Sequence, residues 1–369
     1  MTRHITATAA AALLMVSIAQ AGPVSTLCVD PGDDACFDTI QGAVDAASAG
    51  DQIVIRPRPD GFAYEESVVV ATSDLVISGS MPGSFSIDEF DDLLSIDWSM
   101  EQQNCPSVQI DVCDTRETPG LCGFDADEGL GIAVRSAFNV SAPRVTIEHL
   151  TIRHGFGAIL VNEGADGANL RDNCVVRSHV GFVAGTDEPL TLVENVTVTR
   201  NRMFSVTTSE RNPEQFAVQI HGNGAVVSQN LLNQADGIKV ADGETGGSSV
   251  SLNAVLLSED VNGIEVRNGA NHRIENNYIR LTEGDAISLF QTSTSEVVGN
   301  RIVDIPDDEG GIRSRESSDL LMADNVIVGS SDSAVVQELG AARVENNEIR
   351  SVGGDLGDFC VRTSGAGVV

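Results

Sequence analysis

The chain has few basic and few aromatic residues. Lys and Arg number 22 against 54 Asp and Glu, which gives a formal net charge of −32, and aromatic residues make up 4% of the sequence. This charge repels nucleic acid and anionic membranes, so we expect neither as a partner. The scarcity of aromatic rings argues against a cleft that grips sugars by stacking. The acidic excess fits either a need for solubility or the binding of cations.

Long apolar runs are absent after the first residues. Residues 1–21 have a basic start, a short apolar run and the small-residue ending Ala19-Gln20-Ala21. This pattern is typical of a secretory signal peptide, and we predict cleavage before Gly22. No other run is long enough to cross a membrane once the signal is removed. The expected location is secreted, periplasmic or at the cell surface.

Cysteine occurs seven times, but never as Cys-x-x-Cys, so the usual signature of a zinc or redox site is missing. Export favours disulfides instead. Cys28 and Cys36 flank a short turn-rich loop, and we predict that they pair. The odd number leaves at least one cysteine unpaired within the chain. The pairing of the others stays open: Cys105, Cys113, Cys122, Cys174 and Cys360.

What the sequence does contain is an internal repeat. Its frame is an apolar residue, two variable residues, Asn, one variable residue and a second apolar residue, as in IENNYI at 274–279. Copies recur about every 23 residues, with one longer interval, and a fixed period in this range indicates stacked coils. An earlier copy, IEHLTI, has Leu150 in the place of Asn. The Asn positions are Asn173, Asn195, Asn230, Asn253, Asn277, Asn300, Asn325 and Asn347.

A strand pattern precedes each Asn turn. GIKVA at 237–241 and GIEVR at 263–267 alternate apolar and polar residues. One repeat is therefore a strand, a turn, a short strand, an Asn turn, a short strand and a loop. Such coils stack into an all-β parallel β-helix, because one coil cannot bury its apolar face alone. Stacked side-chain amides would form a ladder through the Asn turns, although Asn also favours turns by itself.

Near the N-terminus, the spacing of the apolar residues changes from strand alternation to a helical pattern. Asp38 or Thr39 can cap a helix, and Gly50 can end it. A short helix here would cover the open end of the solenoid core. Its apolar face would consist of Ile40, Ala43, Val44 and Ala47.

The segment TIQGAVDAASAGDQIVIRP, followed by YEESVVV, LVISGS and the Asn repeats, resembles the secreted right-handed parallel β-helix proteins of the pectin-lyase-like superfamily. The resemblance covers most of residues 36–365. It implies a right-handed parallel β-helix solenoid with a short N-terminal capping helix. It implies no single activity, because that superfamily includes lyases, hydrolases, esterases, epimerases and adhesins.

The expected organisation is a signal peptide over 1–21 and a single β-helix domain over 22–369. We expect two departures from the regular coil, a Cys-bearing acidic insertion at 82–128 and a protruding loop at 208–216. No Gly-x-Ser-x-Gly motif occurs, and His residues are few. Asp307 and Asp308 could act as a paired acid and base, but an exposed turn explains them better.

The few basic residues gather on one expected strand face. The alternation places Lys239, Glu265, Ser288, Arg313 and Val335 in one outward column. The next column is Ala241, Arg267, Phe290, Arg315, Gln337 and Arg362. Because Arg binds carboxylate or sulfate bidentately, this strip suits an anionic sugar chain. The alternative is that these cations neutralise nearby acids such as Glu265, Glu316 and Glu338. The residues expected to bind substrate are Arg313, Arg315, Arg362 and His221.

EVRNGANHRIENN also resembles a motif of chondroitinase B-like and alginate lyases, in which a basic residue before a Gly serves in catalysis. Arg267 is the matching position, with Lys239 as the candidate partner. Glu265 and Asp285 could then contribute to a Ca²⁺ site. Three functions remain: binding of acidic extracellular polysaccharide or surface glycan without catalysis, a Ca²⁺-assisted lyase acting on uronate polymers, and a purely structural solenoid.

Overall fold

The structure is a computed structural model. The described residues are 24–80, 104–112, 136–153, 157–178, 180–186, 190–206, 216–241, 243, 246–258, 261–306, 310–330, 333–350, 361–364 and 367–368. Several expectations lie outside these residues, namely the signal peptide, most of the insertion at 82–128, the loop up to residue 215, and the Asp307–Asp308 pair. Cys113, Cys122 and Cys360 also lie outside them.

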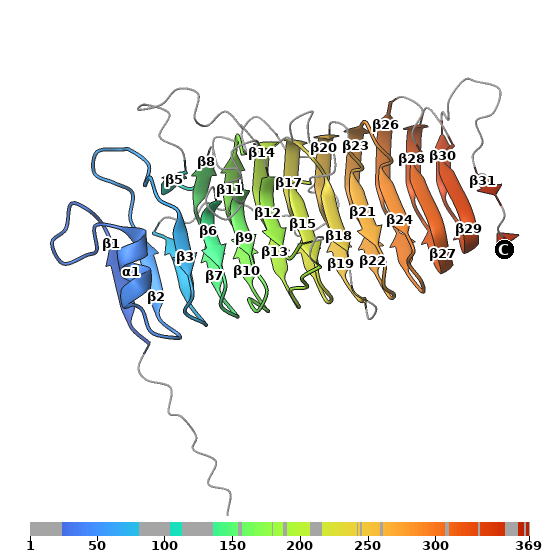
Figure 1. The fold of residues 1–369 in the computed structure, drawn as a ribbon. Helices are drawn as coiled ribbons and strands as arrows, with labels where there is room; N and C mark the ends of the chain where they lie inside the picture. The colour runs from blue at the N-terminus through green and yellow to red at the C-terminus, as the bar shows by residue number, and fades with distance from the viewer. Residues whose placement is uncertain are drawn as a thin grey trace, which may run out of the picture.

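The chain winds into a parallel β-helix, as the repeat predicted, with the coils stacked in a row from the N-terminal to the C-terminal end (Figure 1). Three strand faces run along the stack, and we call them faces A, B and C. Strands of successive coils pair in parallel on each face, for example Ile238 with Ile264 and Ile264 with Ile287 on face A. The regular register gives every side chain a counterpart in the next coil.

Face A carries the candidate site. Its strands are β3 (Val68–Val70), β6 (Ser136–Val140), β9 (Gly157–Val161), β12 (Val180–Ala184), β15 (Val218–His221), β18 (Ile238–Ala241), β21 (Ile264–Arg267), β24 (Ile287–Phe290), the first parts of β27 (Ile312–Ala323) and β29 (Val335–Glu345), and β31 (Val361–Ser364). The long strands β27 and β29 continue into face B, so that faces A and B together form one 22-stranded sheet.

Face B follows face A within each coil. Its other strands are β1 (Thr26–Val29), β2 (Gln52–Ile55), β4 (Val76–Gly79), β7 (Thr146–Glu148), β10 (Asn169–Arg171), β13 (Thr197–Thr199), β16 (Val226–Ser228), β19 (Ser249–Ser251), β22 (Arg273–Glu275), β25 (Glu296–Val298) and β32 (Gly367–Val368). Its strands are mostly short, in agreement with the short strand expected before each Asn turn.

Face C is a separate ten-stranded sheet. Its strands are β5 (Gln109–Asp111), β8 (Thr151–Arg153), β11 (Cys174–Val176), β14 (Arg202–Val206), β17 (Leu231–Ala235), β20 (Ala254–Ser258), β23 (Tyr278–Thr282), β26 (Arg301–Ile305), β28 (Val326–Ser330) and β30 (Glu348–Arg350). β5 corrects one expectation, because it lies within the segment assigned to an insertion. Val108 and Ile110 are fully buried there, and β5 pairs with β8 as a regular part of the coil.

The single helix of the described residues, α1 (Ile40–Ala46), lies at the N-terminal end of the stack against β1, β2 and β3 (Figure 1). Thr39 caps it by accepting a hydrogen bond from the Gly42 backbone N–H. This confirms the short capping helix and selects Thr39 as its cap. The helix ends earlier than predicted, because Ala47 is already extended and Gly50 lies in the following turn. No helix among the described residues is long and apolar enough to cross a membrane.

A ladder of Asn side chains, all buried except the half-buried Asn347, runs through the turns between faces B and C. Each Nδ2 donates to the Oδ1 of the next Asn, at 2.9 Å from Asn230 to Asn253 and 3.0 Å from Asn253 to Asn277. The backbone N–H of each Asn donates to the same oxygen, as Asn253 does to Asn277 at 3.0 Å. The ladder consists of Asn173, Asn201, Asn230, Asn253, Asn277, Asn300, Asn325 and Asn347.

Asn195 is not part of this ladder, which corrects one predicted position. It is exposed, and its φ of 57° places it in a left-handed turn before face B. Gly224 has the same conformation in the following coil, with a φ of 69°. The left-handed region suits Gly and Asn, which explains the Asn at this place. The ladder residue of this coil is Asn201, within VTRNRM, which fits the same sequence frame.

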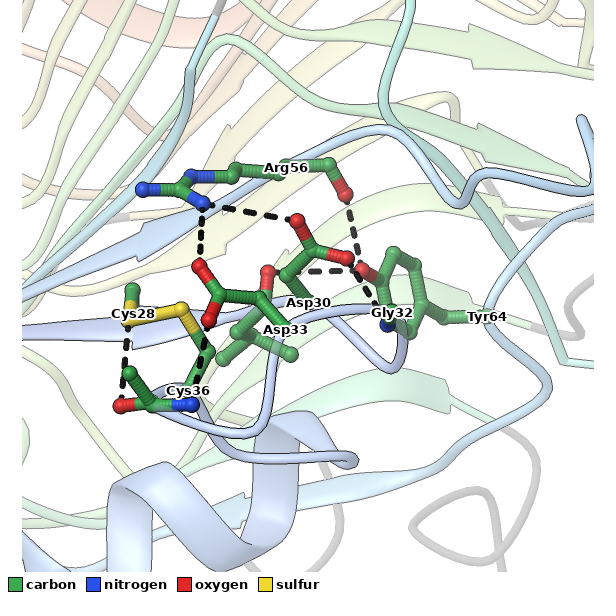
Figure 2. The surroundings of a disulfide bond; sticks show 9 residues. Cys28, Asp30, Gly32, Asp33, Cys36, Arg56 and Tyr64 are labelled. Atoms are coloured by element: carbon green, nitrogen blue, oxygen red, sulfur yellow. Dashed lines mark hydrogen bonds and ion pairs between the residues drawn. A yellow bond between two sulfur atoms is a disulfide. The ribbon is translucent and has the colours of Figure 1, made fainter.

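Two disulfides are present in the described part of the chain. Cys28 and Cys36 pair as the loop between them predicted, with Cα atoms 4.9 Å apart. Arg56 closes this loop from outside, with Nη1 3.4 Å from Asp30 and 3.1 Å from Asp33 (Figure 2).

The second disulfide joins Cys105 to Cys174 across a sequence separation of 69 residues. The sequence had left this pairing open. Cys174 begins β11 on face C, and Cys105 precedes β5. The bond therefore ties the segment that leads into β5 to the outside of face C. The two bonds support a location outside the cytoplasm, where disulfides persist.

Candidate binding face

Two rows of side chains project outward from face A between β15 and β27. The residues between them, such as Ile264 and Val266, point into the core and are buried. The first row is Gln219, Lys239, Glu265, Ser288 and Arg313. The second row is His221, Ala241, Arg267, Phe290 and Arg315.

Two charged residues of the first row, Lys239 and Glu265, are buried. The side chain of Lys239 is 2% exposed and that of Glu265 is 6% exposed, with Lys239 Nζ 4.0 Å from Glu265 Oε1. The ring of Phe216 lies 5.9 Å from the same Nζ. Asn262 donates from Nδ2 to the other carboxylate oxygen, Glu265 Oε2, at 2.7 Å. Glu265 is therefore positioned by contacts from its own coil and from the preceding one.

Further along the first row, Asp285 contacts Arg313. Asp285 Oδ1 lies 3.3 Å from Arg313 Nε and accepts a hydrogen bond from the Gly310 backbone N–H at 3.0 Å. Ca²⁺ prefers six to eight oxygen ligands. Glu265 and Asp285 instead each face a cationic side chain, and no three His, Cys, Asp or Glu among the described residues are grouped so as to hold a metal. The contacts of these two carboxylates do not fit a Ca²⁺ site, and we derive no metal-assisted step.

In the second row, Arg267, Phe290 and Arg315 are accessible to solvent, whereas His221 and Ala241 are buried. The side chains of Arg267 and Arg315 are 40% and 47% exposed, and the half-buried Phe290 lies between them in register. Each guanidinium has a carboxylate beside it, with Arg267 Nε 2.5 Å from Glu265 Oε1 and Arg315 Nε 3.3 Å from Glu338 Oε2. Since neighbouring strands are about 4.8 Å apart, the two arginines flank the ring at a separation of about 10 Å.

The structure corrects the rows at their C-terminal end. Arg313 pairs with Val336 rather than Val335, and Arg315 pairs with Glu338 rather than Gln337. Val335 and Gln337 point inward and are fully buried. A slip of one residue moves a side chain to the opposite face of a strand, and the two adjacent valines gave no alternation to prevent it.

Two residues expected to bind substrate differ from the expectation, Arg362 in its row and His221 in its exposure. Arg362 is exposed, but it pairs with Val336 and so continues the first row rather than the second. His221 belongs to the second row and is fully buried, with Nε2 2.7 Å from Gln219 Nε2. The accessible basic residues that the structure brings together are therefore Arg267 and Arg315, with Phe290 between them.

The structure also bears on the lyase hypothesis. That hypothesis placed Arg267 among positive charges, as a base needs. Arg267 instead contacts the carboxylate of Glu265, which Lys239 also approaches. Sequence reasoning missed Asn262 and Phe216 as neighbours of this pair. Asn262 stands two residues before Ile264, where Asp236 stands before Ile238 and Asp285 before Ile287, and this recurrence of polar residues was the available signal.

The family comparison agrees with this architecture. The sequence model described as "Right handed beta helix region" matches residues 216–366, which include the candidate face from β15 onward. The chain thus contains a right-handed β-helix region, which confirms the fold class that the resemblance implied. No curated protein matches the sequence.

Several solved structures are similar in fold at low sequence identity. The Dettilon tailspike protein (gp208) has a TM-score of 0.50 at 10% identity, over 91% of this chain and 68% of that one. The GH136 lacto-N-biosidase from Eubacterium ramulus has a TM-score of 0.49 at 12% identity, over 93% and 67%. The periplasmic alginate epimerase AlgG has a TM-score of 0.47 at 11% identity, over 93% and 83%. At these identities the likeness concerns the fold alone.

Proposed function

We propose that this protein binds an anionic extracellular polysaccharide, such as a polymer of uronate sugars, along the outside of face A and does not cleave it. The observation that carries the proposal is the accessible row Arg267, Phe290 and Arg315, in register on three successive coils.

The chemistry of the row matches such a ligand. A guanidinium binds a carboxylate or sulfate through two parallel hydrogen bonds. The ring of Phe290 offers an apolar surface between the two guanidinium groups, against which the face of a sugar could lie. Glu265 and Glu338 hold Arg267 and Arg315 by ion pairs, which reduces the side-chain entropy that binding would otherwise cost. Repulsion from the acidic remainder of the protein confines an anionic chain to this row.

Binding without cleavage follows from the same contacts. Abstraction of the proton beside a uronate carboxylate needs a base in its deprotonated form. Arg267, the residue that the lyase resemblance nominates, has a carboxylate 2.5 Å from its Nε. We therefore assign Arg267 a binding role.

The test is retention on immobilised polyuronate, with a neutral polysaccharide as the reference, for the wild type and for the Arg267→Ala/Arg315→Ala double variant. The control is Arg280→Ala, because Arg280 on β23 is also 47% exposed and has Asp304 3.2 Å away, yet lies on face C. Loss of charged hydrogen bonds should weaken binding roughly ten- to hundredfold for each arginine. Arg280→Ala should retain wild-type affinity.

Two results would overturn the proposal. One is a double variant that binds like the wild type, and the other is a wild type that no polyanion retains, which would favour a purely structural solenoid. The same samples should be assayed with and without Ca²⁺ for an unsaturated product that absorbs in the ultraviolet. Appearance of that product would replace binding by lyase activity.

A further inference from the structure

Lys239 is the only lysine in the chain, since every other residue among the 22 Lys and Arg is arginine. It is also one of the largest fully buried side chains. A need for positive charge alone would be met by arginine, as it is everywhere else in the sequence. Arginine differs in that its guanidinium is always charged, whereas a buried lysine amine can lose its proton and become a nucleophile.

The neighbours of this lysine form a specific arrangement across two coils. Lys239 belongs to β18, whereas Asn262 and Glu265 belong to the next coil, in which Glu265 pairs with Lys239 in register. The two oxygens of Glu265 face the two nitrogens: Oε1 lies 4.0 Å from Lys239 Nζ, and Oε2 accepts from Asn262 Nδ2 at 2.7 Å. One carboxylate therefore bridges an amine and a primary amide.

The surroundings keep solvent away from the amine and the carboxylate. The side chains of Lys239 and Glu265 are almost fully buried, and the Phe216 ring lies 5.9 Å from Nζ. Glu265 Oε1 is buried and accepts no hydrogen bond from the described residues, although Arg267 Nε is 2.5 Å away outside a hydrogen-bonding direction. Asn262 is half-buried, so a small product released from its side chain can reach solvent.

We propose that Lys239 and Asn262 become joined by an intramolecular amide bond, with Glu265 as the proton carrier. Lys239 gives a proton to Glu265, and the lone pair on Nζ then forms a bond to Cγ of Asn262. The Cγ–Nδ2 bond breaks, and Nδ2 leaves with protons from Nζ and from Glu265. One ammonium ion and one secondary amide result, while Glu265 returns to its carboxylate form.

This modification is independent of the proposed function. It uses the buried Lys239 and Glu265 of the first row, whereas polysaccharide binding uses Arg267, Phe290 and Arg315 in the second row. The bond would join β18 covalently to the coil that contains β21. Glu265 would keep Arg267 as its ionic partner after the lysine had become neutral.

The test is peptide mapping of the denatured, reduced protein by mass spectrometry after trypsin digestion. An unlinked chain is cleaved after Lys239, and its ε-amine reacts with an amine label. The wild type should instead give one uncleaved peptide, residues 212–267, which contains both Lys239 and Asn262 and is lighter than the same sequence without the link by one ammonia molecule. No lysine label should appear. A free, labelled Lys239 in the folded wild type would overturn the proposal.

Variants separate the roles of the three residues. Glu265→Gln should give unlinked Lys239, and a linked product in that variant would exclude Glu265 as the proton carrier. Asn262→Ala provides a second test if Glu265→Gln fails to fold, because Asn262 is half-buried, and it too should leave Lys239 free. Glu275→Gln is the matched control, since Glu275 also contacts an arginine, Arg273 Nε at 2.6 Å, and should keep the link. The Arg267→Ala/Arg315→Ala variant should no longer bind the polysaccharide but should keep the bond between Lys239 and Asn262.

Discussion

Asn277 Nδ2 donates a hydrogen bond to Asn300 Oδ1 at 2.9 Å, and the backbone N–H of Asn277 donates to the same oxygen at 3.0 Å. Asn277 Nδ2 also reaches the Val250 carbonyl, at 2.9 Å. One side chain thus serves three successive coils.

Replacement of Asn277 should therefore lower the free energy of unfolding. Asn277→Leu removes the side-chain donor to the Val250 carbonyl and to Asn300 Oδ1, and it leaves the backbone N–H of Asn253 without its acceptor. Each buried group left unpaired costs roughly 1–3 kcal/mol. The matched control is Asn233→Leu, because Asn233 points outward from β17 and is half-buried. The melting temperature should be clearly lower for Asn277→Leu than for the wild type, and it should change little for Asn233→Leu. Equal melting temperatures would contradict a stabilising ladder.

The residue before each ladder Asn adopts a left-handed conformation, and some coils have a residue there that disfavours it, such as Leu252. Leu252 has a φ of 55°, whereas Asn276 and Gly299 occupy the same place in the next two coils. A left-handed conformation costs a residue such as Leu roughly 1–2 kcal/mol, and less for Asn. Leu252→Asn should raise the melting temperature. A variant less stable than the wild type would show that packing of the half-buried Leu outweighs the backbone cost.

The two disulfides should differ in their contribution to stability. In the chain-entropy model, a loop of 69 residues, as closed by Cys105–Cys174, gives about 4 kcal/mol. A loop of 8 residues, as closed by Cys28–Cys36, gives about 2.5 kcal/mol. Denaturant unfolding of the two double Cys→Ala variants measures the difference. A greater loss for Cys28→Ala/Cys36→Ala would contradict the expected order.

His272 should make stability depend on pH. Burial holds the pKa of His272 below its usual value of 6.5, although the hydrogen bond from Nε2 to the Asn268 carbonyl, at 2.8 Å, acts in the opposite direction. The unfolded chain then binds a proton near pH 6.5, and the folded chain binds it only at lower pH. The stabilisation is present above pH 6.5 and is lost as the pH falls below it.

The measurement is the melting temperature of the wild type and of His272→Gln at about pH 7.5 and about pH 5.5, on either side of the ordinary His pKa. On acidification, the melting temperature of the wild type should fall further than that of the variant. Titration of carboxylates lowers both melting temperatures alike, so the difference between them reports on His272. The same loss in both proteins would show that His272 does not contribute.

The fold could be predicted from the sequence because each copy of the repeat corresponds to one coil of the β-helix. Apolar alternation in GIEVR and the recurring Asn are local signals of positions that contact the same positions in the next coil. The frame failed at Asn195 because VTRNRM, with Asn201, matches it equally well. The discriminating signal was spacing, since Asn201 divides the interval from Asn173 to Asn230 almost evenly, whereas Asn195 does not.

The site was less predictable, because it depends on burial rather than on residue type. Lys239 and Arg267 look alike in the sequence as basic outward positions, yet one is buried beside Phe216 and the other is exposed. The partner of Cys174 was equally hidden. It follows from the pairing of β5 with β8, which joins segments far apart in the chain.

The regular register has a consequence for how the molecule can vary in length. Residues 253–276 run from one ladder Asn to the position before the next, and so they form one complete turn of the winding. A tandem duplication of this block would add one strand spacing, about 4.8 Å, to the long axis. Asn277 would then accept from the duplicated Asn253 as it now accepts from the original. Elongation or shortening by whole turns is thus open to this chain. The loops also tolerate gain or loss of residues, since neighbouring ladder Asn residues stand between 22 and 29 residues apart. A change of one residue within a strand, in contrast, moves the side chains that follow it in that strand to the opposite face.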